Sequence, residues 1–298
     1  MANLKDLRVR IESVKSTQKI TSAMKMVAAS KFKRAQEHVE ASRPYTLKMS
    51  AMMNSLALGV TDIESAPKLL VGTGKQERHL IVVASSDRGL CGGFNATIIR
   101  ETRRMVQALR SKGKEILILT IGRKAKDMLR REFSQIILEG FEDIAKPRVT
   151  FTIANKIAKR ICDLYEEKEI DVCTLIFNQF KSALTQIVTR KQMIPALLDE
   201  KNQSVKISTS DIGDAIYTYE PNEEELLQEL LPKSLAIQLY GALLENAASE
   251  QGARMTAMDN ATRNAGDMIK QLRIKYNRTR QAVITKELIE VISGAEAL

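Results

Sequence analysis

The segment MTAMDNATRNAGDMIKQLRIKYNRTRQAV, residues 255–283, decides the fold of this chain. Its seam positions recur at alternating steps of three and four residues: Met255, Met258, Thr262, Ala265, Ile269, Leu272, Tyr276, Thr279 and Val283. This spacing keeps one face of a long helix turned toward a helical partner. No proline interrupts residues 233–298. We therefore expect residues 220–298 to form a long helix that pairs with another.

The N-terminal segment is the expected partner. Apolar residues again follow heptad spacing at Leu4, Leu7, Ile11 and Val14. We expect a helix up to Pro44, a kink at Pro44, and a further helical stretch over residues 45–58 that ends at Gly59. At about 1.5 Å per residue, the two terminal helices would span roughly 65 and 100 Å. Two such helices pair when the chain between them returns to its start, so an antiparallel coiled coil is predicted.

The middle of the chain has a different pattern of apolar residues. Residues 60–76 hold Pro67, Gly72 and Gly74 and read as a linker. Short apolar runs at 79–84, 114–120, 135–138 and 171–177 alternate with helical stretches at 96–111, 123–132 and after Pro147. Residues 183–194 are expected as an edge strand. This βαβα order predicts an α/β fold with a Rossmann-like, largely parallel sheet. The expected domains are 1–58, 59–76, 77–219 and 220–298.

The charge and the cysteine content of the chain indicate its partners and its compartment. The net charge is +10 with a pI near 9.4, which favours an acidic protein, a nucleic acid or a membrane surface. Three cysteines, Cys91, Cys162 and Cys173, form no CxxC pair, so a reduced compartment is expected. No run of about 18 apolar residues predicts a membrane span. The start of the chain lacks the apolar core of a secretory signal, and its amphipathic character resembles a mitochondrial presequence.

The loop SSDRGLCGGFN, residues 85–95, joins a strand to a helix, where α/β proteins often bind phosphate. Gly89, Gly92 and Gly93 do not make the GxGxxG spacing of dinucleotide sites. A tight turn is one interpretation, and a protein contact loop with exposed Asp87 and Arg88 is the one we favour. Cys91 has no candidate base nearby in the sequence.

No catalytic, cofactor or metal site is predicted. The segment Gly72-Thr-Gly-Lys75 departs from a phosphate loop, because Leu69 and Gln76 stand where a glycine and a magnesium-binding hydroxyl belong. His38 and His79 have no neighbours at metal-ligand spacing. The basic patch at residues 273–280 lies beside the heptad seam. Its long donors suit capture by acceptors on a surrounding protein.

These residues resemble one known family, the gamma subunit of F-type ATP synthase without the plastid insertion. The resemblance covers the whole chain. It is strongest in three signatures: TQKITSAMKMVAASK at 17–31, SDRGLCGG at 86–93, and SEQGARMTAM at 249–258 with NRTRQAVITKEL at 277–288. Tyr219-Glu-Pro221 and Ile292-Ser-Gly294 match as well. The chain begins almost at the family's shared start, so we expect no spare presequence.

The resemblance implies a central-stalk rotor with no catalytic residue of its own. Its partners would be the alpha and beta subunits of a catalytic hexamer, an epsilon or delta-type stalk subunit, and a ring of membrane c subunits. Rotation would couple proton flow to ATP synthesis or hydrolysis at the beta sites. The implied beta-subunit contacts are Met24, Lys25, Asp87, Arg88, Cys91, Arg280 and Gln281; the implied c-ring and epsilon contacts are Tyr219 and Glu220.

Two other functions stay open at this point. Charge alone also fits a basic coiled-coil protein that binds nucleic acid, although stacking aromatics are few. The Gly-rich loop also fits a small nucleotide-binding α/β enzyme. The expected location is peripheral, on the cytoplasmic face of a bacterial inner membrane or the matrix face of the mitochondrial inner membrane. The source membrane, coupling ion, c-ring size and preferred direction are set by other chains or by conditions.

Overall fold

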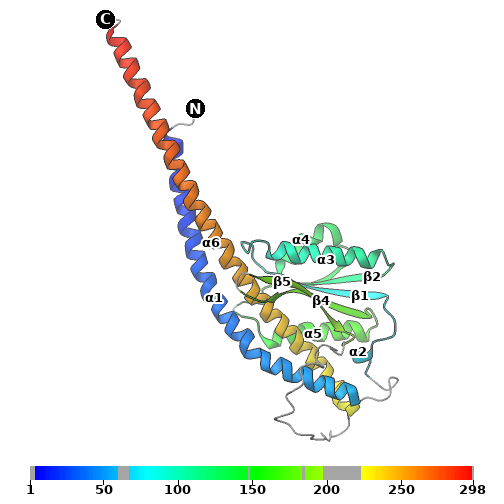
Figure 1. The fold of residues 1–298 in the computed structure, drawn as a ribbon. Helices are drawn as coiled ribbons and strands as arrows, with labels where there is room; N and C mark the ends of the chain where they lie inside the picture. Colours follow the sequence, from blue (N-terminus) through cyan, green and yellow to red (C-terminus); the bar gives the residue numbers. More distant parts are fainter. Residues whose placement is uncertain (1–3, 60–66, 147, 183–184, 197–222, 297–298) are drawn as a thin grey trace. The chain divides into compact units, whose positions relative to one another are not determined.

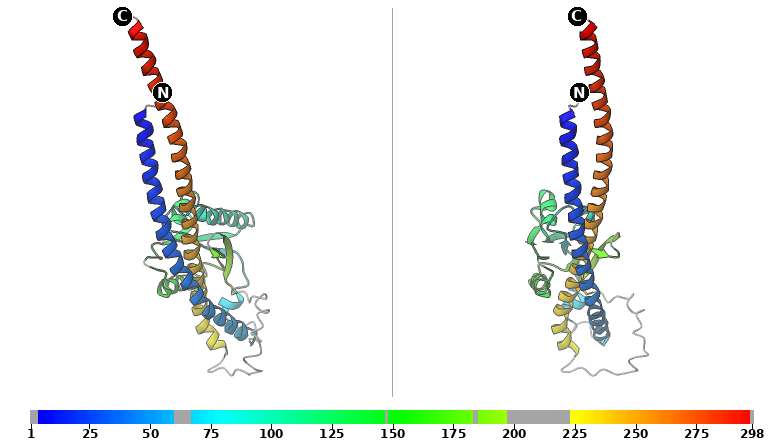
Figure 2. Two further views of the ribbon diagram at one scale, coloured as in Figure 1. Left: turned by 60° about the vertical axis from the view of Figure 1, so that its left-hand side comes forward. Right: turned by 90° about the vertical axis from the view of Figure 1, so that its left-hand side faces the viewer.

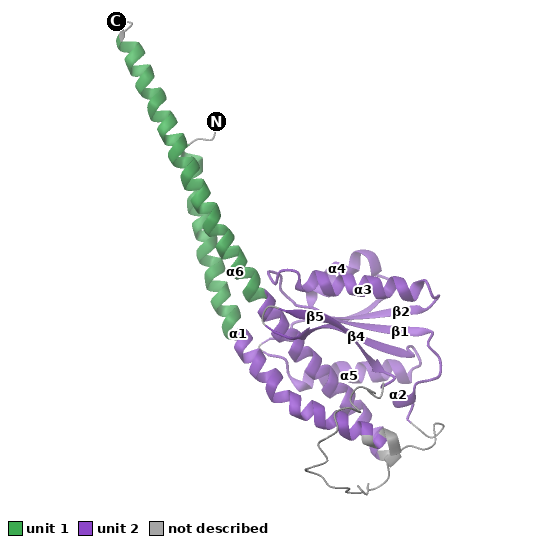
Figure 3. Cartoon of the chain, viewed as in Figure 1, with its two compact units in different colours: residues 1–30, 254–298 green, residues 31–253 purple. Residues whose placement is uncertain are grey.

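The computed structural model describes residues 4–59, 67–146, 148–182, 185–196 and 223–296. The chain divides into two compact units (Figure 3): unit 1 holds residues 1–30 and 254–298, and unit 2 holds residues 31–253. Two long helices, α1 (Leu4–Gly59) and α6 (Glu223–Glu296), contribute to both units. Tyr219 and Glu220 lie outside the described residues, as do residues 60–66 of the expected linker.

Unit 1 is an antiparallel pair made by the ends of α1 and α6, which lie side by side in Figures 1 and 2. The α6 seam is buried or half-buried from Met255 to Thr279, as its heptad spacing predicts. Leu7, Ile11 and Ala28 are buried on α1 in the same unit. Val283 is the exception, since it is 36% exposed. The expected seam is therefore too long by one position, because α6 has passed the described start of α1 at Leu4.

The helix does not end before Pro44: α1 is a single helix from Leu4 to Gly59, with Pro44 inside it. Pro44 lies on the exposed side of the helix, while Ser42 and Thr46 are half-buried. The missing N–H and the ring therefore disturb the solvent side, and the packed side continues. Residues at steps of three and four stay buried or half-buried along α1 in unit 2: Phe32, Ala35, Val39, Ser42, Thr46, Met49, Met53 and Leu56.

Unit 2 is built on a five-stranded sheet of order β3-β2-β1-β4-β5. Four strands are parallel: β1 (Arg78–Ala84), β2 (Glu115–Ile121), β3 (Ile137–Phe141) and β4 (Val172–Phe180). The edge strand β5 (Gln186–Ile194) runs antiparallel to β4. The largely parallel sheet and the edge strand are thus confirmed. The chain crosses from β2 and β3 to β4 on the far side of β1, so the direction of winding reverses between β1 and β4.

Helices cover both faces of this sheet (Figure 1). On one face, α3 (Phe94–Arg110) and α4 (Arg123–Phe133) pack on Ile81 and Val83 of β1. On the other, α5 (Phe151–Glu166) packs on Leu80 and Val82 together with the unit 2 segments of α1 and α6. Alternate residues of β1 therefore enter two cores, which explains its unbroken apolar run. A four-residue helix, α2 (Lys68–Val71), precedes β1.

Gly122 stands at the close approach of two loops, between β2 and α4. Its φ is +94°, and a Cβ added there would lie 2.6 Å from the carbonyl oxygen of Ser85. Gly113 also has a positive φ, +69°, but a Cβ there would meet nothing within 4 Å. A comparison of substitutions at the two glycines therefore distinguishes the cost of backbone strain from the cost of steric overlap.

We predict that Gly122→Ala lowers the free energy of unfolding by about 3 kcal/mol or more, because strain and overlap add. Gly113→Ala should lower the free energy of unfolding by only about 1 kcal/mol, because backbone strain is then the single unfavourable effect. Urea unfolding followed by circular dichroism measures both. Similar losses in the two variants would contradict the role given to the contact with Ser85.

Candidate functional site

A charged pair crosses the helix seam of unit 1. Lys25 lies on the heptad seam of α1, and its Nζ is 2.6 Å from Oδ1 of Asp259 on α6. The other carboxylate oxygen is 2.7 Å from the guanidinium of Arg263. The hydrogen bond from Lys25 and the charge of Arg263 lower the pKa of Asp259. Met24, beside Lys25, is half-buried.

The next two levels of the same seam are also polar or small. Thr262 Oγ1 lies 2.8 Å from Thr21 Oγ1, so the two hydroxyls meet across the helices. One turn further along, a Cβ added to Gly266 would lie 3.1 Å from Nε2 of Gln18. The missing side chain lets the glutamine pack against the backbone of α6. At three successive levels of the seam, α1 and α6 thus meet through hydrogen bonds or a close approach. Such contacts define the register of two paired helices more strictly than apolar contacts do.

Arg280 and Gln281 lie on α6 just beyond the buried seam, and both side chains are exposed. Every described residue from 280 to 295 is exposed. Several of them are large aliphatics at 36–70% exposure: Val283, Ile284, Leu288, Ile289, Val291 and Ile292. Exposed apolar surface of this kind marks a protein interface. We therefore expect this part of α6 to be covered by a partner protein. Arg280 and Gln281 therefore lie where the paired part of α6 ends and its exposed, apolar part begins.

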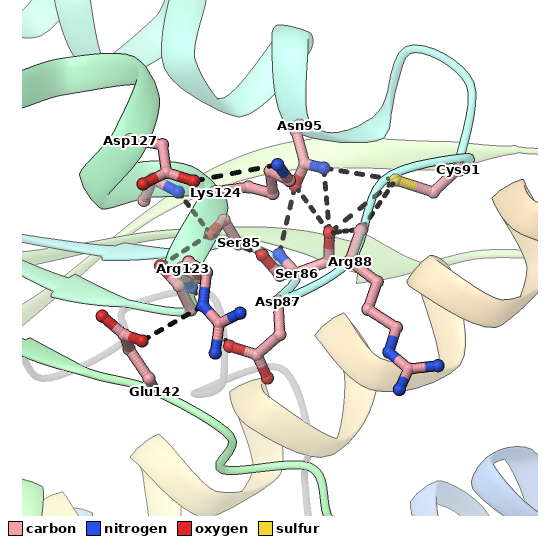
Figure 4. Close-up of polar contacts among 12 residues, drawn as sticks. Ser85, Ser86, Asp87, Arg88, Cys91, Asn95, Arg123, Lys124, Asp127 and Glu142 are labelled. Carbon is pink, nitrogen blue, oxygen red and sulfur yellow. Dashed lines mark hydrogen bonds and ion pairs between the residues drawn. The ribbon is translucent and has the colours of Figure 1, made fainter.

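The loop after β1 closes the N-terminus of α4 (Figure 4). Its consecutive residues Ser85, Ser86 and Asp87 each accept a hydrogen bond from one residue of the first turn. Ser85 Oγ accepts from Ala125 N at 2.8 Å, the Ser86 carbonyl from Lys124 N at 3.0 Å, and Asp87 Oδ1 from Arg123 N at 3.1 Å. Helix N-termini attract anions, and here the chain's own carboxylate takes that place.

Asp87 consequently has a structural role. Its Oδ1 also accepts the backbone N–H of Asp143 at 3.1 Å, which ties the loop after β3 to the loop after β1. Arg123 meets Glu142 at 3.2 Å, and Lys126 meets it at the same distance. The hydrogen bonds from Lys126 and Arg123 lower the pKa of Glu142. The base of the loop is therefore held by a polar network that joins α4 to the residues after β3.

Cys91 is buried in the same loop. Its side chain is 2% exposed, and the amide of Asn95 donates to its Sγ at 3.2 Å and to Ser86 Oγ at 2.8 Å. The thiol is directed into the loop, so Cys91 supports the loop from within. The exposed tip is formed by Arg88, Gly89 and Leu90.

Leu90 is a site residue that sequence reasoning missed. It is 61% exposed and has a φ of +65°, an uncommon conformation for a residue with a Cβ. An exposed leucine beside Arg88 presents an apolar contact together with a charge. Its place directly after Gly89, in a glycine-rich loop, was the available signal.

The expected contact residues are divided between the two units. Met24, Lys25, Arg280 and Gln281 belong to unit 1, and Asp87, Arg88 and Cys91 belong to unit 2. Tyr219 and Glu220 lie outside the described residues. Within the described ranges, no group of histidine, cysteine and carboxylate side chains suits a metal ion. The same residues include no helix long and apolar enough to cross a membrane.

Unit 1 is an antiparallel pair of terminal helices and unit 2 is a three-layer α/β unit, and known proteins show which family has this combination. The family model described as ATP synthase matches residues 3–298. The ATP synthase gamma chains of Paramagnetospirillum magneticum strain AMB-1 and Rhodospirillum rubrum are each 55% identical to this chain, over 298 and 299 residues, with all of both chains covered. The chain belongs to the ATP synthase gamma-chain family, as a non-catalytic subunit of bacterial type.

Solved structures agree with this assignment. The Tetrahymena thermophila mitochondrial ATP synthase, central stalk and c-ring, matches with a TM-score of 0.62 and 29% identity over 81% of this chain and 99% of that chain. A chain of the Euglena gracilis mitochondrial ATP synthase, OSCP/F1/c-ring, has a TM-score of 0.70 over 99% of this chain and 94% of its own. At 19% identity, the Euglena match shows the fold alone.

We predict that Asp259→Asn lowers the thermal unfolding midpoint of the chain at pH 7 and has a smaller effect at pH 2. The folded state lowers the pKa of Asp259 from its ordinary 3.8. Its stabilising contribution is therefore present above 3.8 and lost as the pH falls through the lower folded value. Scanning circular dichroism at both pH values measures the difference.

Asp267→Asn is the matched control, because Asp267 pairs with Lys270 of its own helix, at 3.3 Å. Its effect at pH 7 should be smaller than that of Asp259→Asn. Equal effects of the two variants would show that the contact across the helices adds nothing.

Proposed function

We propose that this chain turns as the rotor of the central stalk, coupling ion flow through a membrane c ring to ATP synthesis or hydrolysis at the beta subunits. Family membership supports the assignment to ATP synthase. The observation that carries the mechanical part is the exposed aliphatic end of α6, residues 283–292. An apolar helix end of this kind needs a surrounding protein surface, and a ring of alpha and beta subunits provides one.

The proposed contact residues fall into separate groups. Arg280 and Gln281 project from the first unpaired turns of α6, where their donors meet acceptors of a beta subunit. Lys25 and Met24 lie at a lower level of the paired helices. The loop tip at Arg88 and Leu90 supplies another beta contact, which Asp87 and Cys91 support from its base. Tyr219 and Glu220 are proposed to meet the c ring and the epsilon subunit.

Paired helices suit the transmission of torque, since two packed helices resist bending better than one. An asymmetric, positively charged surface inside a ring gives each rotation angle its own contact energy. A rotor shifts the conformations of catalytic subunits only through such differences in contact energy. We propose no nucleic-acid partner, and the alternatives of a nucleic-acid binder and a nucleotide-binding enzyme are set aside by the family.

The chain is proposed to be peripheral on an energy-transducing membrane, held there through the complex. The compared relatives with the highest identities are bacterial, which favours the cytoplasmic face of a bacterial inner membrane over the mitochondrial matrix face. The decisive experiment is native purification from that membrane. The chain should co-purify with magnesium-dependent ATPase activity, and its recovery as a lone polypeptide would contradict the proposal.

We predict that replacing Arg280 and Gln281 together with Ala reduces coupled ATP turnover of the assembled complex while the chain stays folded. Both side chains are exposed, so the loss should follow from contacts with the partner. Losing charge-assisted hydrogen bonds worth about 1.5–3 kcal/mol each predicts at least a tenfold effect if both bonds act in the rate-limiting state. ATP-driven proton pumping in reconstituted vesicles is the measurement.

The matched control replaces Arg100 and Gln107 with Ala, an exposed arginine and glutamine on α3. This control removes the same charge and the same amide from unit 2, and its turnover should equal that of the unmodified complex. Full turnover in the Arg280 and Gln281 double variant would remove these residues from the coupling mechanism.

A further inference from the structure

The C-terminal end of β4 extends beyond its parallel neighbour. β4 pairs with β1 only as far as Ile176, opposite Val83, and then continues to Phe180 beside β5 alone. The unpaired edge of β4 lies on the side of β1, where the direction of winding reverses. In open α/β sheets, ligands bind outside the strand ends at this position. Here residues of α6 fill it.

Two side chains of α6 bond to the backbone of one β4 residue. Asn246 Oδ1 accepts the N–H of Asn178 at 3.1 Å, and Ser249 Oγ donates to the carbonyl of Asn178 at 3.1 Å. The side chain of Asn178 in turn donates to the carbonyl of Phe94, at the start of α3, at 3.4 Å. Asn178, Asn246 and Ser249 are all at most 5% exposed. The helix thus satisfies the backbone groups that a neighbouring strand would otherwise satisfy.

The same strand end also contacts α1. The ring of Phe180 packs on the ring of Phe32 of α1, with centroids 5.5 Å apart and an interplanar angle of 59°. Both residues belong to unit 2, as do Asn246 and Ser249 of α6. One end of one strand therefore contacts both long helices within a span of three residues.

Buried polar bonds constrain a helix differently from apolar packing. Apolar side chains tolerate small shifts along and around a helix, whereas a buried donor or acceptor without its partner carries a large penalty. The bonds to Asn178 therefore define the position of α6 along and about its own axis relative to the sheet. The aromatic contact at Phe32 adds a hold on α1.

We infer that Asn178, Phe180, Asn246, Ser249 and Phe32 form a clamp, the β4 clamp, through which the α/β unit holds both long helices and passes rotation to them. This inference rests on the proposed rotor function. It assigns a positioning role to the sheet edge where related α/β folds bind ligands. The helix α6 continues without interruption from the clamp to the residues of unit 1.

The experiment uses the full chain, alone and in the reconstituted complex. Asn246→Leu removes the acceptor for Asn178 N–H, and Ser249→Ala removes the donor to its carbonyl. Gln228→Leu, at an exposed position of α6 in unit 2, is the matched control. Hydrogen exchange of the Asn178 amide in the isolated chain reports the clamp. Protons pumped per ATP hydrolysed in vesicles report the coupling.

The two clamp variants should each lower the number of protons pumped per ATP hydrolysed, and Asn246→Leu should speed exchange at Asn178. Gln228→Leu should change neither. Asn246→Asp keeps an acceptor oxygen and should retain more coupling than Asn246→Leu. A purely structural role would lower assembly yield and leave the pumping ratio unchanged. If Asn246→Leu does not assemble, the smaller change Ser249→Ala decides.

Three results would overturn the inference. The first is an unchanged pumping ratio in Ser249→Ala and in any other clamp variant that assembles, and the second is unchanged exchange at Asn178 in Asn246→Leu. An equal loss of coupling in Gln228→Leu would overturn it as well. Failure of the unmodified chain to form a coupled complex would contradict the proposed function instead. In that case exchange at Asn178 still tests the contact itself.

Discussion

The heptad seam between α1 and α6 is the constraint on which the structure depends. A helix with a long apolar face is stable in water only when that face is covered, and the two ends of the chain cover each other in unit 1. Antiparallel pairing requires the intervening residues to return the chain to its start. A three-layer α/β unit does this, because its strands and helices alternate in direction and the unit 2 segments of α1 and α6 pack on one face of its sheet.

Polar groups give this pairing its register. Lys25 with Asp259 and Thr21 with Thr262 interrupt the apolar contact in unit 1, while Asn246 and Ser249 of α6 bond to β4 in unit 2. Such groups contribute less to stability than leucines of similar size, but they penalise every alignment except one. A rotor needs defined alignment, since an angular error at one end of α6 would change the contacts made at the other.

Much of the fold is predictable from the sequence because it depends on periodicity. The steps of three and four residues between Met255 and Thr279 predicted the buried side of α6, and the apolar runs predicted the parallel sheet and its edge strand. Whether Pro44 divides the helix is not predictable from the sequence, since a local rule about one missing N–H does not say which side of the helix faces solvent. Val283 was assigned to the seam because periodicity does not reveal where the partner helix begins.

The candidate site divides in the same way. The sequence by itself determined that Arg280 and Gln281 follow the seam and that residues 85–95 form a loop between a strand and a helix, because both depend on spacing along the chain. Only the tertiary structure decided that Asp87 caps α4, that Cys91 is turned inward, and that Asn178 bonds to Asn246 and Ser249. These contacts join residues distant in sequence, and their partners are chosen by how helices and strands pack, which no local pattern of residues records.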